Sequence, residues 1–213
     1  MFQYFYPHDY KDSTYEINFE EYYKKGYRGV LFDIDNTLVM HGADADEKAE
    51  QLFRELKKIG FSTCLISNNK EERVKRFNKN IRTKYIFKAG KPLKKNYIKA
   101  MEMMGTNPKN SIFVGDQIFT DVIGAKRCGM HCILVKPINP KEEIQIVLKR
   151  YLERPIIKSY EKYKQKSESN ISKNKNWNVS IVKCWGKRYI VPIIIIICKN
   201  KFYTSGIVFS CIL

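Results

Sequence analysis

The chain has 213 residues and a formal net charge of +17 at pH 7. This length suits one α/β domain with a sizeable core, or one domain followed by a tail. The charge predicts an anionic partner of some kind, either a phosphorylated substrate, a membrane surface or nucleic acid, although solubility alone would also account for it. Six cysteines without a Cys-x-x-Cys pair or zinc spacing, and a start unlike a signal peptide, predict a cytoplasmic protein.

Residues 1–28 are rich in Tyr and Phe and carry charges of both signs. We expect this lead-in to pack on the core, covering an edge or a face of a sheet, with one short helix over residues 19–27. Gly26 would end that helix.

Residues 29–155 alternate short apolar runs with amphipathic helical patterns. Such alternation predicts an α/β fold, a doubly wound and mainly parallel five-stranded sheet. We expect strands at residues 30–32, 61–66, 85–89, 111–114 and 131–135. The expected helices are 46–59, 71–80, 93–104, 122–128 and 142–152.

The first apolar run ends in Asp33-Ile34-Asp35-Asn36-Thr37. The carboxyl ends of parallel strands share one edge of the sheet, where such folds bind ligands. Two carboxylates there, with Thr37 close behind, suit a Mg²⁺ site with an aspartate nucleophile. The alternative is a polar turn after a buried strand.

Three later segments also end strands in polar groups. Ser67 could offer its hydroxyl to a phosphate, or serve as a turn or N-cap residue. Lys91, in Gly-Lys-Pro, could neutralise a phosphate and the charge of Asp33. Asp116, in Gly-Asp-Gln, could complete a Mg²⁺ site. Asp121 could orient Lys91 or a metal-bound water, or be only a favourable charge at a helix N-terminus.

Residues 33–38, Ser67, Lys91-Pro92 and residues 115–121 resemble, in order, the four motifs of the haloacid dehalogenase (HAD) superfamily of phosphatases. The wording of the first and fourth motifs most resembles the YqeG-type enzymes of HAD subfamily IIIA, relatives of the mitochondrial phosphatidylglycerophosphatase. The resemblance implies a HAD-like Rossmannoid fold and a Mg²⁺-dependent phosphomonoester hydrolase working through an aspartyl-phosphate.

The resemblance also implies a role for each matching residue. Asp33 would be the nucleophile, and Asp35 the general acid and base. Asp33, the backbone carbonyl of Asp35 and Asp116 would hold Mg²⁺. The phosphoryl oxygens would be bound by Ser67, Asn68 and Lys91, with Thr37 and Asp121 supporting the site from behind.

The segments in which HAD enzymes carry cap domains are too short here for a cap, so we expect an open site. Many cations between residues 70 and 99 flank it, and they predict peripheral contact with an anionic membrane surface. Phosphatidylglycerophosphate is therefore the leading substrate. The alternatives are soluble sugar phosphates or nucleotides, or a non-catalytic basic module that binds nucleic acid. No nucleic-acid partner is expected, because the chain has no RNA-recognition, zinc-finger or helix-turn-helix signature.

Residues 156–213 are expected to form a basic linker and an atypical C-terminal tail with poor order. Residues 167–176 form a polar, linker-like run. The apolar run 189–198 is about half as long as the ~20 residues that a membrane-spanning helix needs. The oligomeric state stays open.

Overall fold

The computed structural model describes residues 2–139, 144–175, 179–182, 193–198 and 201–204. The chain divides into two compact units, residues 1–160 and 161–213, and each is described by itself.

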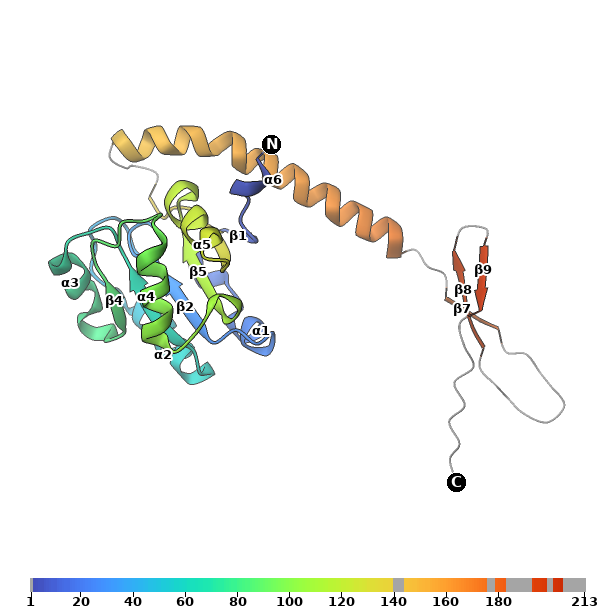
Figure 1. Ribbon diagram of the computed structural model, residues 1–213, viewed down its shortest axis with the longest axis horizontal. Helices are drawn as coiled ribbons and strands as arrows, with labels where there is room; N and C mark the ends of the chain where they lie inside the picture. Colours follow the sequence, from blue (N-terminus) through green and yellow to red (C-terminus); the bar gives the residue numbers. More distant parts are fainter. Residues whose placement is uncertain (1, 140–143, 176–178, 183–192, 199–200, 205–213) are drawn as a thin grey trace, which may run out of the picture. The chain divides into compact units, whose positions relative to one another are not determined.

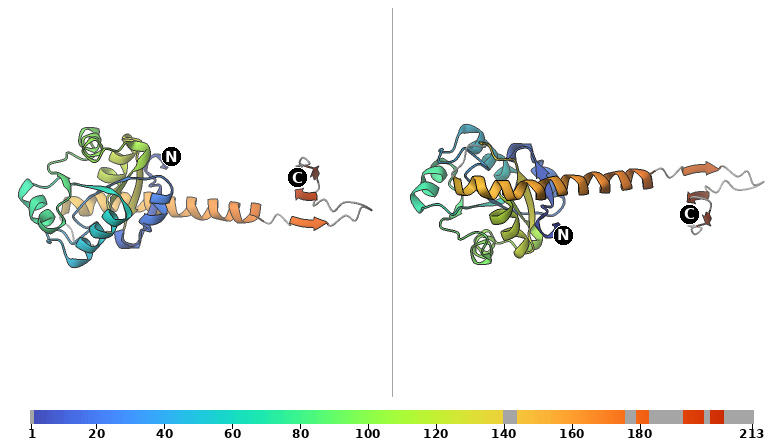
Figure 2. Two further views of the ribbon diagram at one scale, coloured as in Figure 1. Left: turned by 90° about the horizontal axis from the view of Figure 1, so that it is seen from below. Right: turned by 90° about the horizontal axis from the view of Figure 1, so that it is seen from above.

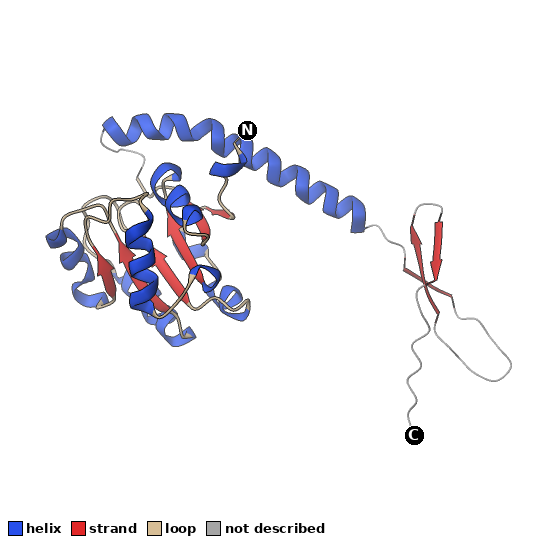
Figure 3. Cartoon of the chain, in the orientation of Figure 1, coloured by secondary structure: helices blue, strands red, loops and turns tan. Residues whose placement is uncertain are grey.

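The first unit is built on one six-stranded sheet in which all neighbouring strands run parallel, in the order β1-β6-β5-β2-β3-β4. Figure 3 shows its strands in red between the helices. The strands are β1 (Asp9–Lys11), β2 (Gly29–Phe32), β3 (Ser62–Ile66), β4 (Lys84–Ile86), β5 (Ser111–Gly115) and β6 (His131–Val135). The helices and helical turns are η1 (Gln3–Phe5), η2 (Thr14–Glu16), α1 (Phe19–Lys24), α2 (Glu47–Ile59), α3 (Glu71–Ile81), α4 (Lys94–Met104), η3 (Pro108–Asn110), η4 (Ile118–Val122), α5 (Ile123–Arg127) and α6 (Ile144–Lys175).

Helices cover both faces of the sheet (Figure 1). Side chains alternate along each strand, so Val30 and Phe32 of β2 face one layer and Leu31 the other. The first layer consists of α1, α2 and α3, and the second of α4, η4, α5 and the first turns of α6. The three central strands, β2, β5 and β3, are thereby buried on both faces, which confirms the predicted α/β class and doubly wound arrangement.

The sheet has one strand more than the five expected, because β1 of the lead-in pairs with β6 at the edge. Asp9–Lys11 is short and polar, and only the pairing with β6 makes it a strand. The lead-in also reaches the loop after β2. The Thr14 hydroxyl donates to the carbonyl of Thr37 (2.8 Å), and the Tyr15 hydroxyl donates to that of Leu38 (2.6 Å).

The fold is capless, as expected. A single loop joins β2 to α2, and another joins β4 to α4, and neither contains an inserted domain in the part of the chain described. The carboxyl ends of the strands therefore open directly outward.

Helix α6 is longer than the sequence predicted. It begins in the first unit and ends at Lys175, so the run 167–175 is helical rather than a linker. Residues 156–175 contain no Gly or Pro and are rich in Lys, which favours helix.

The described residues of the tail beyond α6 form a small antiparallel sheet of β7 (Val179–Val182), β8 (Ile193–Cys198) and β9 (Lys201–Thr204). The expectation of poor order also concerned residues 176–178, 183–192, 199–200 and 205–213, which lie outside the described residues. No helix among the described residues is long and apolar enough to cross a membrane.

Gly124 of α5 lies where the structure leaves no room for a side chain. A Cβ atom there would overlap the ring of Tyr97, whose hydroxyl donates to the carbonyl of Thr120 (3.0 Å). We expect Gly124→Ala to lower the free energy of unfolding by about 1–3 kcal/mol, because the buried ring cannot move away freely. Urea unfolding would measure this, with Ile98→Ala on the exposed side of α4 as a control that changes little. An unchanged urea midpoint for Gly124→Ala would contradict the prediction.

Candidate active site

Strand β2 delivers Asp33 to the carboxyl edge of the sheet, and a tight loop follows it. The Asp33 N–H still donates to the carbonyl of Val114 of β5 (3.0 Å), so the residue continues the strand pairing. Asn36 then takes a left-handed conformation (φ 62°), which Asn tolerates better than most residues. Its N–H donates to the carbonyl of Val39 (2.7 Å), and this closes the loop.

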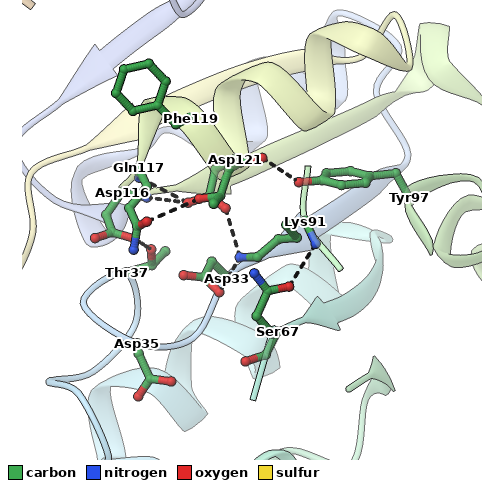
Figure 4. Close-up of polar contacts among 12 residues, drawn as sticks. Asp33, Asp35, Thr37, Ser67, Lys91, Tyr97, Asp116, Gln117, Phe119 and Asp121 are labelled. Carbon is green, nitrogen blue, oxygen red and sulfur yellow. Dashed lines mark hydrogen bonds and ion pairs between the residues drawn. The ribbon is translucent and has the colours of Figure 1, made fainter. Parts of the chain in front are cut away.

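A buried ammonium group joins three separate segments of the chain (Figure 4). Lys91 Nζ lies 2.6 Å from Asp33 Oδ1 and 2.8 Å from Asp121 Oδ1. The Lys91 side chain is only 4% exposed. Burial by itself would lower the pKa of Lys91, but the carboxylates of Asp121 and Asp33 outweigh it and raise that pKa above its ordinary value. Lys91 is therefore a fixed positive charge.

Asp121 is the anchor of this ammonium group. Its Oδ1 binds Lys91, while its Oδ2 accepts the N–H groups of Asp116 and Gln117, each at 3.1 Å. Both carboxylate oxygens of Asp121 therefore bind neighbouring groups of the protein. Asp121 thus contacts Lys91 and two backbone N–H groups, in addition to lying within η4.

Asp116 is fully buried and receives hydrogen bonds from two other elements. The Thr37 hydroxyl donates to its Oδ1 (3.1 Å), and the guanidinium of Arg150 on α6 donates to its Oδ2 and to its backbone carbonyl. Arg150 also lies 3.2 Å from Glu153, whose other oxygen accepts the N–H of Ile118 (2.7 Å) at the start of η4. The first turns of α6 therefore hold the segment that carries Asp116.

Asp35 lies apart from the Asp33–Lys91–Asp121 group in Figure 4. Its Oδ1 accepts the Gly42 N–H (2.7 Å) and lies 2.9 Å from Arg73 Nη2 of α3. Its Oδ2 accepts the side-chain amide of Asn69. These contacts hold the Asp35 carboxylate beside the cavity, which Asp35 helps to line, without a contact to Asp33.

Ser67 and Asn68 lie where β3 ends. Ser67 is buried, and its hydroxyl oxygen accepts the N–H of Asn69 (3.2 Å). The side-chain oxygen of Asn68 accepts the backbone N–H of Lys91 (2.8 Å), so Asn68 holds the loop that carries Lys91. That loop continues with a cis peptide bond between Lys91 and Pro92.

Asp33, Asp35, Ser67, Asn68 and Lys91 border one cavity of about 170 Å³. Asp116 instead lines a neighbouring cavity of about 210 Å³, together with Arg150 and Glu153. Arg73 and Arg150, which the sequence did not assign to the site, hold its carboxylates from outside the cavity. The residues that line the cavity are Asp33, Asp35, Asn36, His41, Ser67, Asn68, Asn69, Lys91, Gln117, Thr120 and Lys149.

The carboxylates fit a divalent metal ion. Ligand oxygens of Asp33, Asp116 and Asp121 lie within 4.8 Å of one another, a set of hard donors that Mg²⁺, Mn²⁺ or Ca²⁺ prefers. Burial raises the pKa of Asp33 to about 6, although Lys91 opposes the shift. Burial also raises the pKa of Asp116 well above its ordinary value, with Arg150 opposing. Lys91 and Arg150 thus do not fully offset the burial of these two carboxyl groups, and a divalent ion bound to them would favour their ionised forms.

Comparison with known proteins agrees with this geometry. A family model described as haloacid dehalogenase-like hydrolase matches residues 43–129. The chain is 32% identical over 156 residues to "Probable phosphatase YqeG" of Bacillus subtilis (strain 168), an alignment that covers 73% of this chain and 91% of that protein. A shorter match, 40% identical over 47 residues, covers 22% of this chain and 17% of the phospholysine phosphohistidine inorganic pyrophosphate phosphatase of Xenopus laevis.

Solved structures of similar fold include two phosphatases. The cobalt-bound deoxy-D-mannose-octulosonate 8-phosphate phosphatase of Haemophilus influenzae has a TM-score of 0.44 and 11% identity, covering 53% of this chain and 80% of that chain. A HAD phosphatase of Thermococcus onnurineus has a TM-score of 0.42 and 16% identity, covering 55% and 90%.

The parallel sheet, the site at its carboxyl edge and the family model define a haloacid dehalogenase-like hydrolase. The long alignment with the B. subtilis protein narrows this further. The chain belongs to the YqeG-type phosphatases of the HAD superfamily, and it is a phosphoric monoester hydrolase. Phosphatases of this superfamily generally use a divalent metal ion. The family resemblance drawn from the four motifs is confirmed.

The buried pairs of Lys91 allow a test of the site's cohesion. We expect Asp121→Ala to lower the free energy of unfolding by about 3–5 kcal/mol, because it leaves a buried ammonium group with half its partners. Asp12→Ala is the matched control, since Asp12 pairs with Lys136 at 2.7 Å on the exposed surface, where such a pair contributes little. Urea unfolding of both variants measures the difference. Equal, small losses in the two variants would mean that the Lys91 pairing does not stabilise the fold.

Proposed function

We propose that this phosphatase hydrolyses phosphomonoesters with Mg²⁺ through an aspartyl-phosphate on Asp33, and that its leading substrate is phosphatidylglycerophosphate. The observation that carries the proposal is the buried Asp33–Lys91–Asp121 group, whose Asp33 and Lys91 line a cavity at the carboxyl edge of a sheet without a cap domain.

In the first step, a carboxylate oxygen of Asp33 attacks phosphorus and forms the P–O bond as the P–O bond to the alcohol breaks. Asp35 gives a proton to the departing alkoxide. Lys91 holds Asp33 in line and offsets charge near the phosphoryl oxygens, since phosphoryl transfer depends mainly on positioning and charge. The Ser67 hydroxyl and the N–H groups of its loop bind those oxygens.

In the second step, Asp35 takes a proton from a water molecule, and the water oxygen attacks phosphorus. The bond between phosphorus and Asp33 breaks, which releases inorganic phosphate and restores the carboxylate. Asp33, Asp116 and the backbone carbonyl of Asp35 would hold Mg²⁺, which neutralises negative charge on the phosphoryl group.

Two features support a lipid substrate. The lack of a cap leaves the cavity accessible to a headgroup that stays in a bilayer. Exposed cations also stand where α3 and α4 begin, after strands β3 and β4 have ended: Lys70 precedes α3, and Lys94 and Lys95 open α4. Each cation near an anionic surface contributes about 1 kcal/mol. We therefore propose a cytoplasmic enzyme in peripheral contact with an anionic membrane.

The test is phosphate release from phosphatidylglycerophosphate in detergent micelles, with the wild type and Asp33→Asn compared. We expect phosphate release by the wild type to stop when EDTA removes the metal. We expect Asp33→Asn to release phosphate about a thousandfold more slowly, since the nucleophile is lost. Urea unfolding checks that the variant is folded.

Small substrates separate the chemistry from the substrate choice. Turnover of p-nitrophenyl phosphate or ribose 5-phosphate without turnover of the lipid would refute phosphatidylglycerophosphate and favour a phosphatase of soluble sugar phosphates or nucleotides. Unchanged activity of Asp33→Asn would refute the aspartyl-phosphate.

Arg73 allows a separate test of Asp35. We expect Arg73→Gln to lower kcat about ten- to a hundredfold with a smaller change in KM, because Asp35 loses the cation that positions it. Lys75→Gln is the matched control, because Lys75 lies on the same helix but pairs with Glu71 at the surface (3.0 Å). Steady-state kinetics on p-nitrophenyl phosphate distinguish the two variants. An equal fall in kcat in the two variants would show that the loss comes from a change to helix α3 in general, and not from the contact between Arg73 and Asp35.

A further inference from the structure

Large apolar side chains are exposed around the mouth of the catalytic cavity. On α6, Leu148 is 65% exposed, Tyr151 68% and Leu152 55%. Two loops beside the cavity add Met40 and Ile138, which are also exposed. Single exposed apolar residues are common on protein surfaces, but a group of them usually marks an interaction surface.

The group on α6 occupies one side of the helix. Leu148, Tyr151 and Leu152 are spaced i, i+3, i+4, so they lie on one face. The other side of the helix carries Glu153 and Tyr160, which are buried in the first unit. In the right-hand view of Figure 2 the first turns of α6 lie across the domain, and no other element is drawn in front of them. Packing inside the first unit therefore does not explain why Leu148, Tyr151 and Leu152 are apolar.

This face adjoins the entrance of the active site. Lys149, next to Leu148, lines the cavity, as does His41, next to Met40. The N–H of Ile138 donates to the carbonyl of Asn36 (3.1 Å), which lines the cavity too. A surface that contacted these apolar residues would present its own groups to Asp33.

The exposed charges on this stretch are of one sign. Among residues 147–160 the exposed charged side chains are Lys149, Arg154 and Lys158. The one acidic residue, Glu153, is buried and bound by Arg150. Apolar residues flanked by cations match the interfacial region of an anionic bilayer. A second copy would instead bring together two chains of net charge +17.

We propose that residues 147–158 of α6 dock the enzyme on an anionic lipid bilayer. Leu148, Tyr151 and Leu152 enter the boundary between headgroups and acyl chains, and Lys149, Arg154 and Lys158 lie at the level of the headgroups. The cavity then faces the headgroups. This inference rests on the proposed lipid substrate for its biological purpose, and its test does not use turnover of that substrate.

The test is sedimentation of the full chain with vesicles of phosphatidylcholine, with and without phosphatidylglycerol. We expect the wild type to sediment with the anionic vesicles, and Leu148→Ser/Leu152→Ser to bind them about tenfold more weakly, because two apolar side chains no longer leave water. Ile98→Ser/Met103→Ser, which changes two exposed apolar residues of α4, is the matched control and keeps wild-type binding. Urea unfolding checks the fold of each variant.

Three results would overturn the proposal. The first is a wild type that binds no vesicle. The second is wild-type binding by Leu148→Ser/Leu152→Ser, which would assign membrane contact to another basic face. The third is a sedimentation velocity experiment in which the double substitution only separates an oligomer, which would make this face a contact between copies. Hydrolysis of phosphatidylglycerophosphate in micelles does not require docking, so its presence or absence tests the proposed function independently.

Discussion

The site depends on one buried ammonium group. Neither Lys91 nor the carboxylates of Asp33 and Asp121 could be buried alone, because an unpaired charge in the interior costs several kcal/mol. Together they satisfy one another at 2.6 and 2.8 Å. The three residues come from the ends of different strands or from the segments that follow them, so the group can form only when the sheet is assembled. Formation of the site therefore requires the assembled sheet.

The lead-in before β2 and helix α6 contribute to the site as well as covering the core. Thr14 and Tyr15 of the lead-in bind the carbonyls of the loop that follows Asp33. At the other side, Arg150 and Glu153 of α6 hold Asp116 and the start of η4. The network that positions the carboxylates thus extends over residues 14–153, beyond the alternating strands and helices.

The electrostatics of the cavity explain why the site suits a metal ion and a phosphate together. Asp33 and Asp116 are both raised in pKa by burial, in spite of Lys91 and Arg150. A divalent cation would keep both carboxylates ionised, and the combined positive charge would then favour a phosphoryl dianion. With no cap to enclose the substrate, recognition beyond the phosphate falls to the rim, to which His41 and Lys149 contribute.

The sequence by itself determined the class of fold and the residues at the carboxyl edge of the sheet. Buried parallel strands read as apolar runs, and the chain turns polar where they end, so Asp33, Ser67, Lys91 and Asp116 could be identified from local pattern alone. The edge strand β1, the helical run to Lys175 and the contacts of Arg73 and Arg150 could not. An edge strand of three polar residues exists only through its partner β6, and a guanidinium on a surface helix has the same sequence signal whether it faces water or a carboxylate. Tertiary packing decides between these, because it brings together residues as far apart as Asp116 and Arg150.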